Sequence, residues 1–225
     1  MPKYLEKITV DGVEYRYESF YWTLTGYIDE TITELLIPDR IDGKQVCGIE
    51  SKAFIRHPNL KRVEFPYTMK KIAQFAFADC VHLESARMWA TGYDLTVGYA
   101  AFSGCHSLTT FDADGVLSVF EYAFKDCHKL SAINCVISAV KSNAFENCNA
   151  LTGPIKLQDG IYFIWKDSFE GSSLNALRFL GNVSTHILEQ RHTNGLSGMK
   201  LICPGDSNVT ELVHDGFCVE VINGQ

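Results

Sequence analysis

Cysteine and histidine are the residues of this sequence that could support catalysis or metal binding. The chain holds eight cysteines and seven histidines. Four of the cysteines recur at one position of a repeated segment: Cys80, Cys105, Cys127 and Cys148. His106 and His128 directly follow two of them. A cysteine beside a histidine is a nucleophile pair, and the same two residue types also bind zinc.

The recurrence of these cysteines favours a structural role, because a catalytic site occurs once whereas a structural element repeats. Stacked one per coil, neighbouring cysteines would lie about 4.8 Å apart with parallel Cβ vectors. A disulfide needs Cβ atoms about 3.8 Å apart that point toward each other. We therefore expect four buried free thiols that pack as small apolar side chains. A bridge between Cys203 and Cys218 remains an alternative in an oxidising compartment.

The motifs of the common enzyme and cofactor sites do not occur in this sequence. Zinc would require four converging ligands, and no CxxC-type spacing provides them. The GxSxG, GxxxxGK[ST] and GxGxxG patterns of hydrolases, nucleotide binders and dinucleotide binders are also missing. We predict no enzyme, no metal and no cofactor. An enzyme that uses a Cys/His site is the most distant alternative.

A segment centred on phenylalanine occurs six times along the chain. Its phenylalanines are Phe54, Phe77, Phe102, Phe124, Phe145 and Phe169. Successive ones lie 23, 25, 22, 21 and 24 residues apart. A branched aliphatic residue stands five positions before each, and a leucine stands six positions after the first five. The length varies only between that leucine and the next aliphatic residue, as expected of a solenoid with one exposed connection per coil.

Short alternating runs follow the leucines. In Arg62-Val63-Glu64-Phe65 and Thr110-Phe111-Asp112-Ala113, every second residue is apolar, which predicts strands with one buried face. One such strand per repeat, always in the same direction, gives a parallel sheet along the array. Each repeat can then bury its apolar face only against its neighbours.

The repeat pattern resembles the BspA-like class of leucine-rich repeats. Leu-x2-Val-x-Phe-Pro followed by Ile-x4-Phe-x2-Cys-x2-Leu matches that class over about residues 32 to 180. The resemblance implies an α/β, β-rich, right-handed solenoid. It also implies a parallel β-sheet on the concave face, short helices or turns on the convex side, and caps at both ends.

We expect one leucine-rich-repeat domain over residues 1–225. A β-hairpin cap with an Asp11-Gly12 turn would occupy residues 1–31, and six to seven repeats would occupy 32–195. The C-terminal cap, 196–225, would begin with the strand Lys200–Pro204. A short helix from about 208 to 214 and a last strand over 217–221 would complete it.

The outward-facing strand residues form the predicted binding face. At the Glu64 position, the coils present Leu36, Glu64, Arg87, Asp112, Asn134, Lys156, Arg178 and Ile202. The charge of this column changes from acidic to basic toward the C-terminus. Opposite charges on neighbouring strands could equally pair as an ordinary solvated sheet, at about 0.2–1 kcal/mol per pair. Our candidate protein-binding residues are Arg62, Glu64, Arg87, Trp89, Asp112, Asn134, Lys156 and Arg178.

Composition narrows the partners further. The net charge of −7 argues against a nucleic-acid partner, and the longest apolar runs are too short for membrane insertion. A protein ligand of unknown identity is therefore expected. The resemblance implies adhesion at a bacterial or protist cell surface, and an intracellular adaptor is the alternative. The first residues lack the apolar core of a signal peptide, so the protein is either kept in the cytoplasm or has lost its signal. The oligomeric state stays open.

Overall fold

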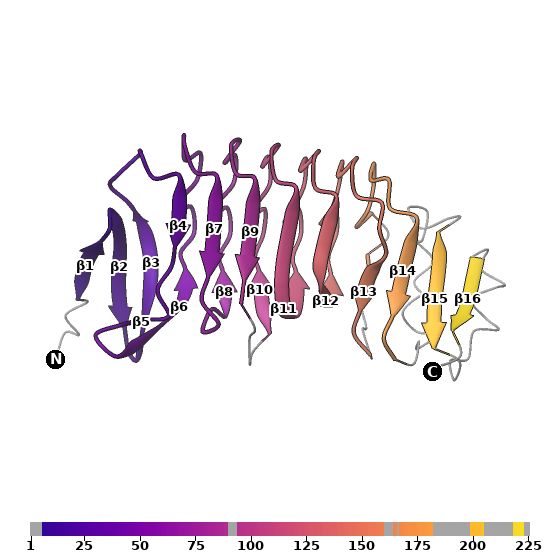
Figure 1. Cartoon of the computed structure of the whole chain (residues 1–225), viewed down its shortest axis with the longest axis horizontal. Helices are drawn as coiled ribbons and strands as arrows, with labels where there is room; N and C mark the ends of the chain where they lie inside the picture. The colour runs from indigo at the N-terminus through magenta and orange to yellow at the C-terminus, as the bar shows by residue number, and fades with distance from the viewer. Residues whose placement is uncertain are drawn as a thin grey trace.

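The computed structural model describes residues 6–89, 94–159, 164–165, 167–181, 199–204 and 218–222. Over these ranges the chain winds into a β-solenoid whose coils stand in a row (Figure 1). From residue 34 to residue 148, each coil has three walls: a strand of a front sheet, a strand of a back sheet and a turn segment. The core between the walls is filled by the apolar residues of the repeat.

The N-terminal cap is an antiparallel meander. Its strands are β1 (Lys7–Val10), β2 (Val13–Glu18) and β3 (Tyr21–Tyr27). The predicted turn between the first two is confirmed, since Asp11 and Gly12 both have positive φ, as a two-residue hairpin turn requires. The third strand was not predicted. It pairs in parallel with β6 and so joins the cap to the back sheet.

The front sheet contains the strands that the alternating pattern predicts. They are β4 (Glu34–Leu36), β7 (Arg62–Phe65), β9 (Ser85–Met88), the first part of β11 (Thr110–Val119) and of β12 (Ala132–Val140), β13 (Ile155–Leu157), β14 (Ala176–Phe179), β15 (Lys200–Pro204) and β16 (Cys218–Ile222). All neighbouring pairs in this row are parallel. Strand β13 pairs with Val136 and Ile137, which lie beyond the part of β12 that faces β9 and the first part of β11. Apolar residues of each strand point inward, which explains the alternation along the sequence.

The back sheet carries the branched aliphatic residue of each repeat. Its short strands are β6 (Lys44–Ile49), β8 (Lys71–Ile72) and β10 (Leu95–Val97), and β5 (Arg40–Ile41) forms a small hairpin with β6. Strands β11 and β12 are long enough to belong to both sheets: residues 110–113 of β11 pair with β9, and residues 117–119 pair with β10. Ile49, Ile72 and Val97 are in register and buried.

The turn wall holds the phenylalanine ladder. Rings of successive coils stack with centroids 5.2–5.4 Å apart, from Phe54 through Phe169. Tyr27 of the cap stacks on Phe54 at 5.3 Å, so the cap continues the ladder. Aromatic stacking adds to the large apolar area that each ring removes from water.

The expectation of short helices on the convex side is wrong for the described residues, which contain strands and turns but no helix. The reason lies in the backbone of the turn wall. Left-handed residues occur two positions before and two positions after the ladder phenylalanine: Lys52 and Arg56, Phe75 and Asp79, Ala100 and Gly104, Tyr122 and Asp126, Asn143 and Asn147. Two left-handed residues within five positions prevent a right-handed helical turn.

The caps are only partly described. The predicted strand Lys200–Pro204 is present as β15, and the last strand runs over Cys218–Ile222, close to the predicted 217–221. The predicted helix at 208–214 lies outside the described residues. Curvature of the front face and handedness of the coil stay predictions of the resemblance.

Candidate functional site

The cysteine ladder of the turn wall is buried and hydrogen-bonded between coils. The thiols of Cys80, Cys105, Cys127 and Cys148 donate to the carbonyl oxygens of Phe54, Phe77, Phe102 and Phe124, at 3.0, 3.2, 3.2 and 3.1 Å. Each accepting phenylalanine belongs to the preceding coil, so every thiol links two coils. The prediction of buried free thiols is confirmed for these four residues.

Burial makes these thiols poor nucleophiles. Loss of hydration disfavours the thiolate and raises the pKa of Cys80 to about 12. The same desolvation raises the pKa of Cys105 and Cys127 well above its usual range. Because the thiolate is the reactive form, the ladder is an inter-coil packing element.

Cys135 and Cys203 extend this pattern beyond the ladder. Both are buried free thiols, and desolvation raises the pKa of Cys135 to about 12 and of Cys203 to about 11. The alternative of a Cys203–Cys218 bridge involves a side chain outside the described residues.

Histidine takes two different places in the coils. His57 stands at the cysteine position of the first coil and is fully buried. Its Nδ1 accepts hydrogen bonds from the backbone amides of Asn59 and Leu60 at 3.3 and 3.1 Å. Desolvation lowers the pKa of this imidazole, because burial disfavours its charged form.

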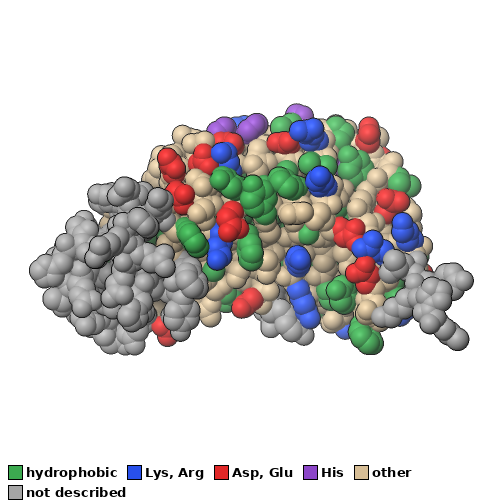
Figure 2. Space-filling view, turned by 180° about the vertical axis from the view of Figure 1, so that it is seen from behind, with side chains coloured by type: hydrophobic (Ala, Val, Ile, Leu, Met, Phe, Trp, Pro, Cys, Tyr) green, Lys and Arg blue, Asp and Glu red, His purple; other side chains and the backbone are tan. Residues whose placement is uncertain are grey.

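Among the described residues, the remaining histidine side chains lie along the outer edge of the turns (Figure 2). The rings of His106 and His128 stack with centroids 5.1 Å apart. Each ring donates from Nδ1 to a carbonyl of the next coil, to Asp126 at 3.0 Å and to Asn147 at 3.1 Å. No cluster of three potential metal ligands occurs in the part of the chain that the structure describes.

The front sheet brings four of the eight predicted binding residues into one column. Register pairs Glu64 with Arg87, Arg87 with Asp112, and Asp112 with Asn134. Arg62 lies in the neighbouring outward column, opposite Ser85. The four polar residues of the first column therefore occupy adjacent strands in consecutive coils.

Trp89 joins this column through direct contacts. Its indole Nε1 donates to Glu64 Oε2 at 3.4 Å, and the Arg87 guanidinium lies over its ring at 4.0 Å. Further along, Asn134 Nδ2 donates to Asp112 Oδ1 at 2.6 Å. The indole is nevertheless 49% exposed. These side chains are fixed by mutual contacts and remain accessible to a partner. We call the group the front cluster; it consists of Glu64, Arg87, Trp89, Asp112 and Asn134.

The basic end of the predicted column is displaced from the front cluster. Lys156 pairs with Val136, not with Asn134, so the register of β13 steps two residues along β12. The expectation of one unbroken column is therefore wrong at this strand. Lys156 and Arg178 are themselves in register, and both are exposed. On the next strand, Arg178 is in register with Ile202.

Two surface features were missed by sequence reasoning. A cavity of about 490 Å³ lies where the cap meets the back sheet, with Arg16, Glu50 and Lys71 among its lining residues. The second feature is a pair of exposed aromatic residues that directly follow back-sheet positions: Phe120 follows Val119 and Trp165 follows Ile164, and they are 38% and 42% exposed. Hydrophobic side chains gather at the middle of this face (Figure 2). No local motif marks either feature, because residues from different coils build both.

None of the described segments is a helix long and apolar enough to cross a bilayer.

Comparisons with known proteins agree with this architecture. A family profile described as BspA type leucine rich repeat region matches six copies over residues 47–175. A leucine-rich repeat protein from Eubacterium ventriosum has a similar solved structure, with 23% identity and a TM-score of 0.53. The match covers 77% of this chain but 51% of that one, so the chain spans about half the length of this neighbour.

A second solved structure, the leucine-rich repeat protein of T. pallidum, is similar over almost its whole length. It shares 18% identity with a TM-score of 0.51, and the match covers 98% of this chain and 97% of that one. At these identities the likeness concerns the fold. No curated protein sequence matches the chain.

Proposed function

Because the chain belongs to the BspA-type leucine-rich-repeat family, we propose that it is a non-enzymatic scaffold that binds a protein through its front sheet. The front cluster and Arg62 would form the centre of the interface, with Lys156 and Arg178 as its basic end. A preformed sheet loses little conformational entropy on binding, so a few well-placed side chains can provide the affinity.

The single observation that supports this proposal is the contact set of Trp89. An indole that is half exposed, held by Glu64 and covered on one side by Arg87, presents a large apolar surface at low entropic cost. Tryptophan and arginine are the residue types most enriched among the side chains that dominate binding energies. The alternating charges of Glu64, Arg87 and Asp112 would favour a partner that carries both basic and acidic groups.

Site-specific photo-crosslinking tests the proposal. A photoreactive amino acid at Arg62 should capture a defined protein from source cells, whereas the same group at Arg56, an exposed residue of the turn wall, should not. Capture should disappear when Trp89→Ala and Asp112→Lys are introduced into the protein that carries the photoreactive amino acid at position 62. Equal capture from both positions, or capture that survives the two substitutions, would contradict binding through the front sheet.

For the setting we propose the cell surface, as the resemblance implies. Protease shaving of intact source cells, followed by mass spectrometry, should release peptides of this chain. If they are recovered only after lysis, adhesion is wrong, and the cytosolic adaptor becomes the hypothesis to pursue with the same crosslinking positions.

A further inference from the structure

The cavity between the cap and the back sheet has a structural cause. Between β3 and β6 the register passes from Trp22↔Val46 to Thr23↔Gly48, which leaves Cys47 as an extra residue in β6. Such a bulge bends its strand and redirects neighbouring side chains. The cavity of about 490 Å³ opens over this bulge and has the size of a small-molecule site. Gly48 and Ala73 line the floor of the cavity, and their small size leaves room above it.

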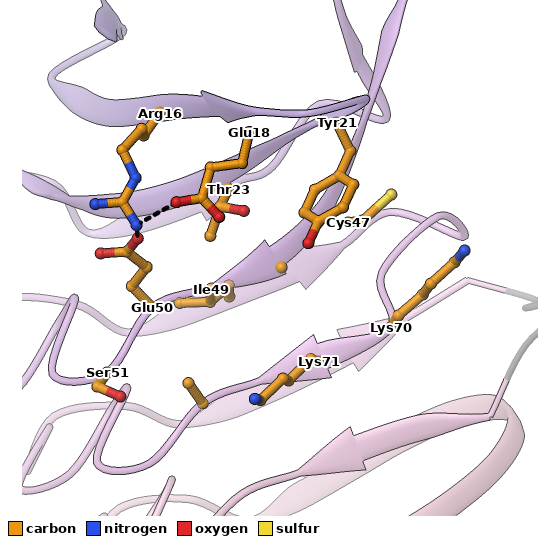
Figure 3. A pocket seen from close by; sticks show the side chains of 12 residues that line it. Arg16, Glu18, Tyr21, Thr23, Cys47, Ile49, Glu50, Ser51, Lys70 and Lys71 are labelled. Atoms are coloured by element: carbon orange, nitrogen blue, oxygen red, sulfur yellow. Dashed lines mark hydrogen bonds and ion pairs between the residues drawn. The ribbon is translucent and has the colours of Figure 1, made fainter. Parts of the chain in front are cut away.

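One side of the cavity is acidic. Arg16 Nη2 forms ion pairs with the carboxylates of both Glu18, at 2.6 Å, and Glu50. Figure 3 shows these three side chains together: Arg16 and Glu18 belong to β2, and Glu50 directly follows the last residue of β6. Two carboxylates around one guanidinium leave a net negative charge and further oxygen lone pairs available to a donor.

The other side of the cavity is basic. Lys71 comes from β8, which lies beyond β6 from the cap. Among the described residues, Lys71 forms no ion pair, unlike Arg16. Lys70 adds a second ammonium group to the lining. The Tyr21 ring projects into the space between the two sides (Figure 3).

From this bipolar lining we propose that the cavity binds a short peptide with free amino and carboxyl termini. The ammonium end would lie beside Glu18 and Glu50, and the carboxylate would lie beside Lys71. An apolar side chain would cover the Gly48–Ala73 floor next to Tyr21. Opposite charges held by different strands favour a zwitterion over an anion or a cation of the same size.

The site lies on the back sheet and shares no residue with the front cluster. Its test is therefore independent of the proposed function: either proposal can fail while the other holds.

The dipeptide Ala-Leu and its three blocked forms test the charges directly. Calorimetry or amide chemical shifts of the full chain should give the tightest binding for Ala-Leu with both termini free. N-acetylation and C-amidation should each weaken binding about tenfold, as the loss of one charge-assisted contact does. Absence of binding by Ala-Leu, or equal affinity for the doubly blocked form, would overturn the proposal.

Charge-neutral variants assign each terminus to one side of the cavity. Lys71→Gln should weaken Ala-Leu to the level of its amide and remove the preference for the free acid, while the preference for the free amine stays. Glu18→Gln should do the reverse. If both variants lose both preferences equally, or neither changes, the proposed orientation is wrong.

A steric pair of variants controls for general effects on the fold. Gly48→Val raises the floor of the cavity without changing any charge, and should weaken Ala-Leu at least tenfold. Ala139→Val is the matched control, because it introduces a valine at the equivalent register position outside the cavity. In-register residues of successive coils are Gly48, Lys71, Thr96, Ser118 and Ala139. Ala139→Val should leave binding unchanged. Equal loss in both variants, at unchanged stability, would place the dipeptide elsewhere.

Discussion

The turn wall and the front sheet follow the same repeat but differ in how much they vary from coil to coil. In the turn wall, phenylalanine recurs in six coils and the ladder cysteine in four. Each ladder ring stacks on the ring of the next coil, and each ladder thiol donates to a phenylalanine carbonyl of the preceding coil. In the outward column of the front sheet, consecutive coils present glutamate, arginine, aspartate and asparagine. The difference indicates that turn-wall side chains serve the contact between coils, while the outward side chains of the front sheet vary without breaking the pairing of its strands.

The largest effect should come from removing one ring of the ladder. Phe102 stacks on Phe77 and Phe124 and contacts Phe111 edge-on. Phe102→Ala should lower the free energy of unfolding by about 3–5 kcal/mol, since it leaves a cavity between two coils. Urea denaturation followed by circular dichroism measures this loss. A loss below about 1 kcal/mol would show that the ladder does not hold the coils together.

Removal of one ladder thiol should have a smaller effect in the same wall. Cys127→Ala deletes the bond to Phe102 and leaves a small void, so we expect a loss of about 1–2 kcal/mol in the same denaturation experiment. Cys127→Ser should also be less stable than the unaltered protein. The natural Ser172 donates to Phe169 of its own coil at 2.7 Å, not to the preceding coil. If the free energy of unfolding of Cys127→Ala is unchanged, the thiol of Cys127 contributes nothing measurable to stability.

His57 should make the first coil sensitive to acid. Burial lowers the pKa of its imidazole below the ordinary 6.5, so the unfolded chain binds a proton more readily than the folded chain. This contribution to stability is complete above about pH 6.5 and is lost as the pH falls toward the folded pKa. Denaturation at pH 7.5 and 5.5 should show it.

His57→Phe is the matched control for that measurement, because it keeps a ring against Tyr27 and Phe54. The difference in stability between pH 7.5 and 5.5 should be smaller in His57→Phe than in the unaltered chain. An identical pH dependence in the two proteins would assign the acid sensitivity to other groups.

The smallest effect on stability should come from the front sheet. Glu64→Gln and Arg87→Gln remove exposed or half-exposed charges, so each should change the free energy of unfolding by less than about 0.5 kcal/mol. Under the proposed function, the same substitutions should weaken partner capture. A large loss of stability in either variant would show that the front cluster, like the turn wall, is needed to hold the coils.

The sequence predicts the parts of this fold that depend on repetition. The spacing of Phe54 through Phe169 places the ladder. The alternation around Glu64 places the front-sheet strands β4, β7, β9, β11 and β12 in the correct register. The buried state of Cys80 and Cys127 follows from the same spacing. The turn Asp11-Gly12 is predicted as well, because its conformation depends on those two residues alone.

Features that are set by contacts between neighbouring coils could not be predicted from the sequence. Left-handed backbone at Phe75, Ala100 and Tyr122 excludes helices from the turn wall, although none of these residue types favours that conformation. The two-residue step at Lys156 follows from pairing with Val136, which no spacing rule specifies. The pairing of Arg16 with Glu50 joins residues of the cap and the first coil, so the cavity beside them was invisible in the sequence.

The long strands β11 and β12 have a mechanical consequence. The coils of β7 and β9 meet their neighbours through a front strand and a separate short back strand, β8 or β10, whereas β11 and β12 pair with each other along one strand that crosses both sheets. Under tension applied at the two ends, coils at the ends would peel away one at a time and the middle would yield last. Each coil of 21–25 residues would release roughly 75–90 Å of chain. The array would then lengthen in steps of one coil.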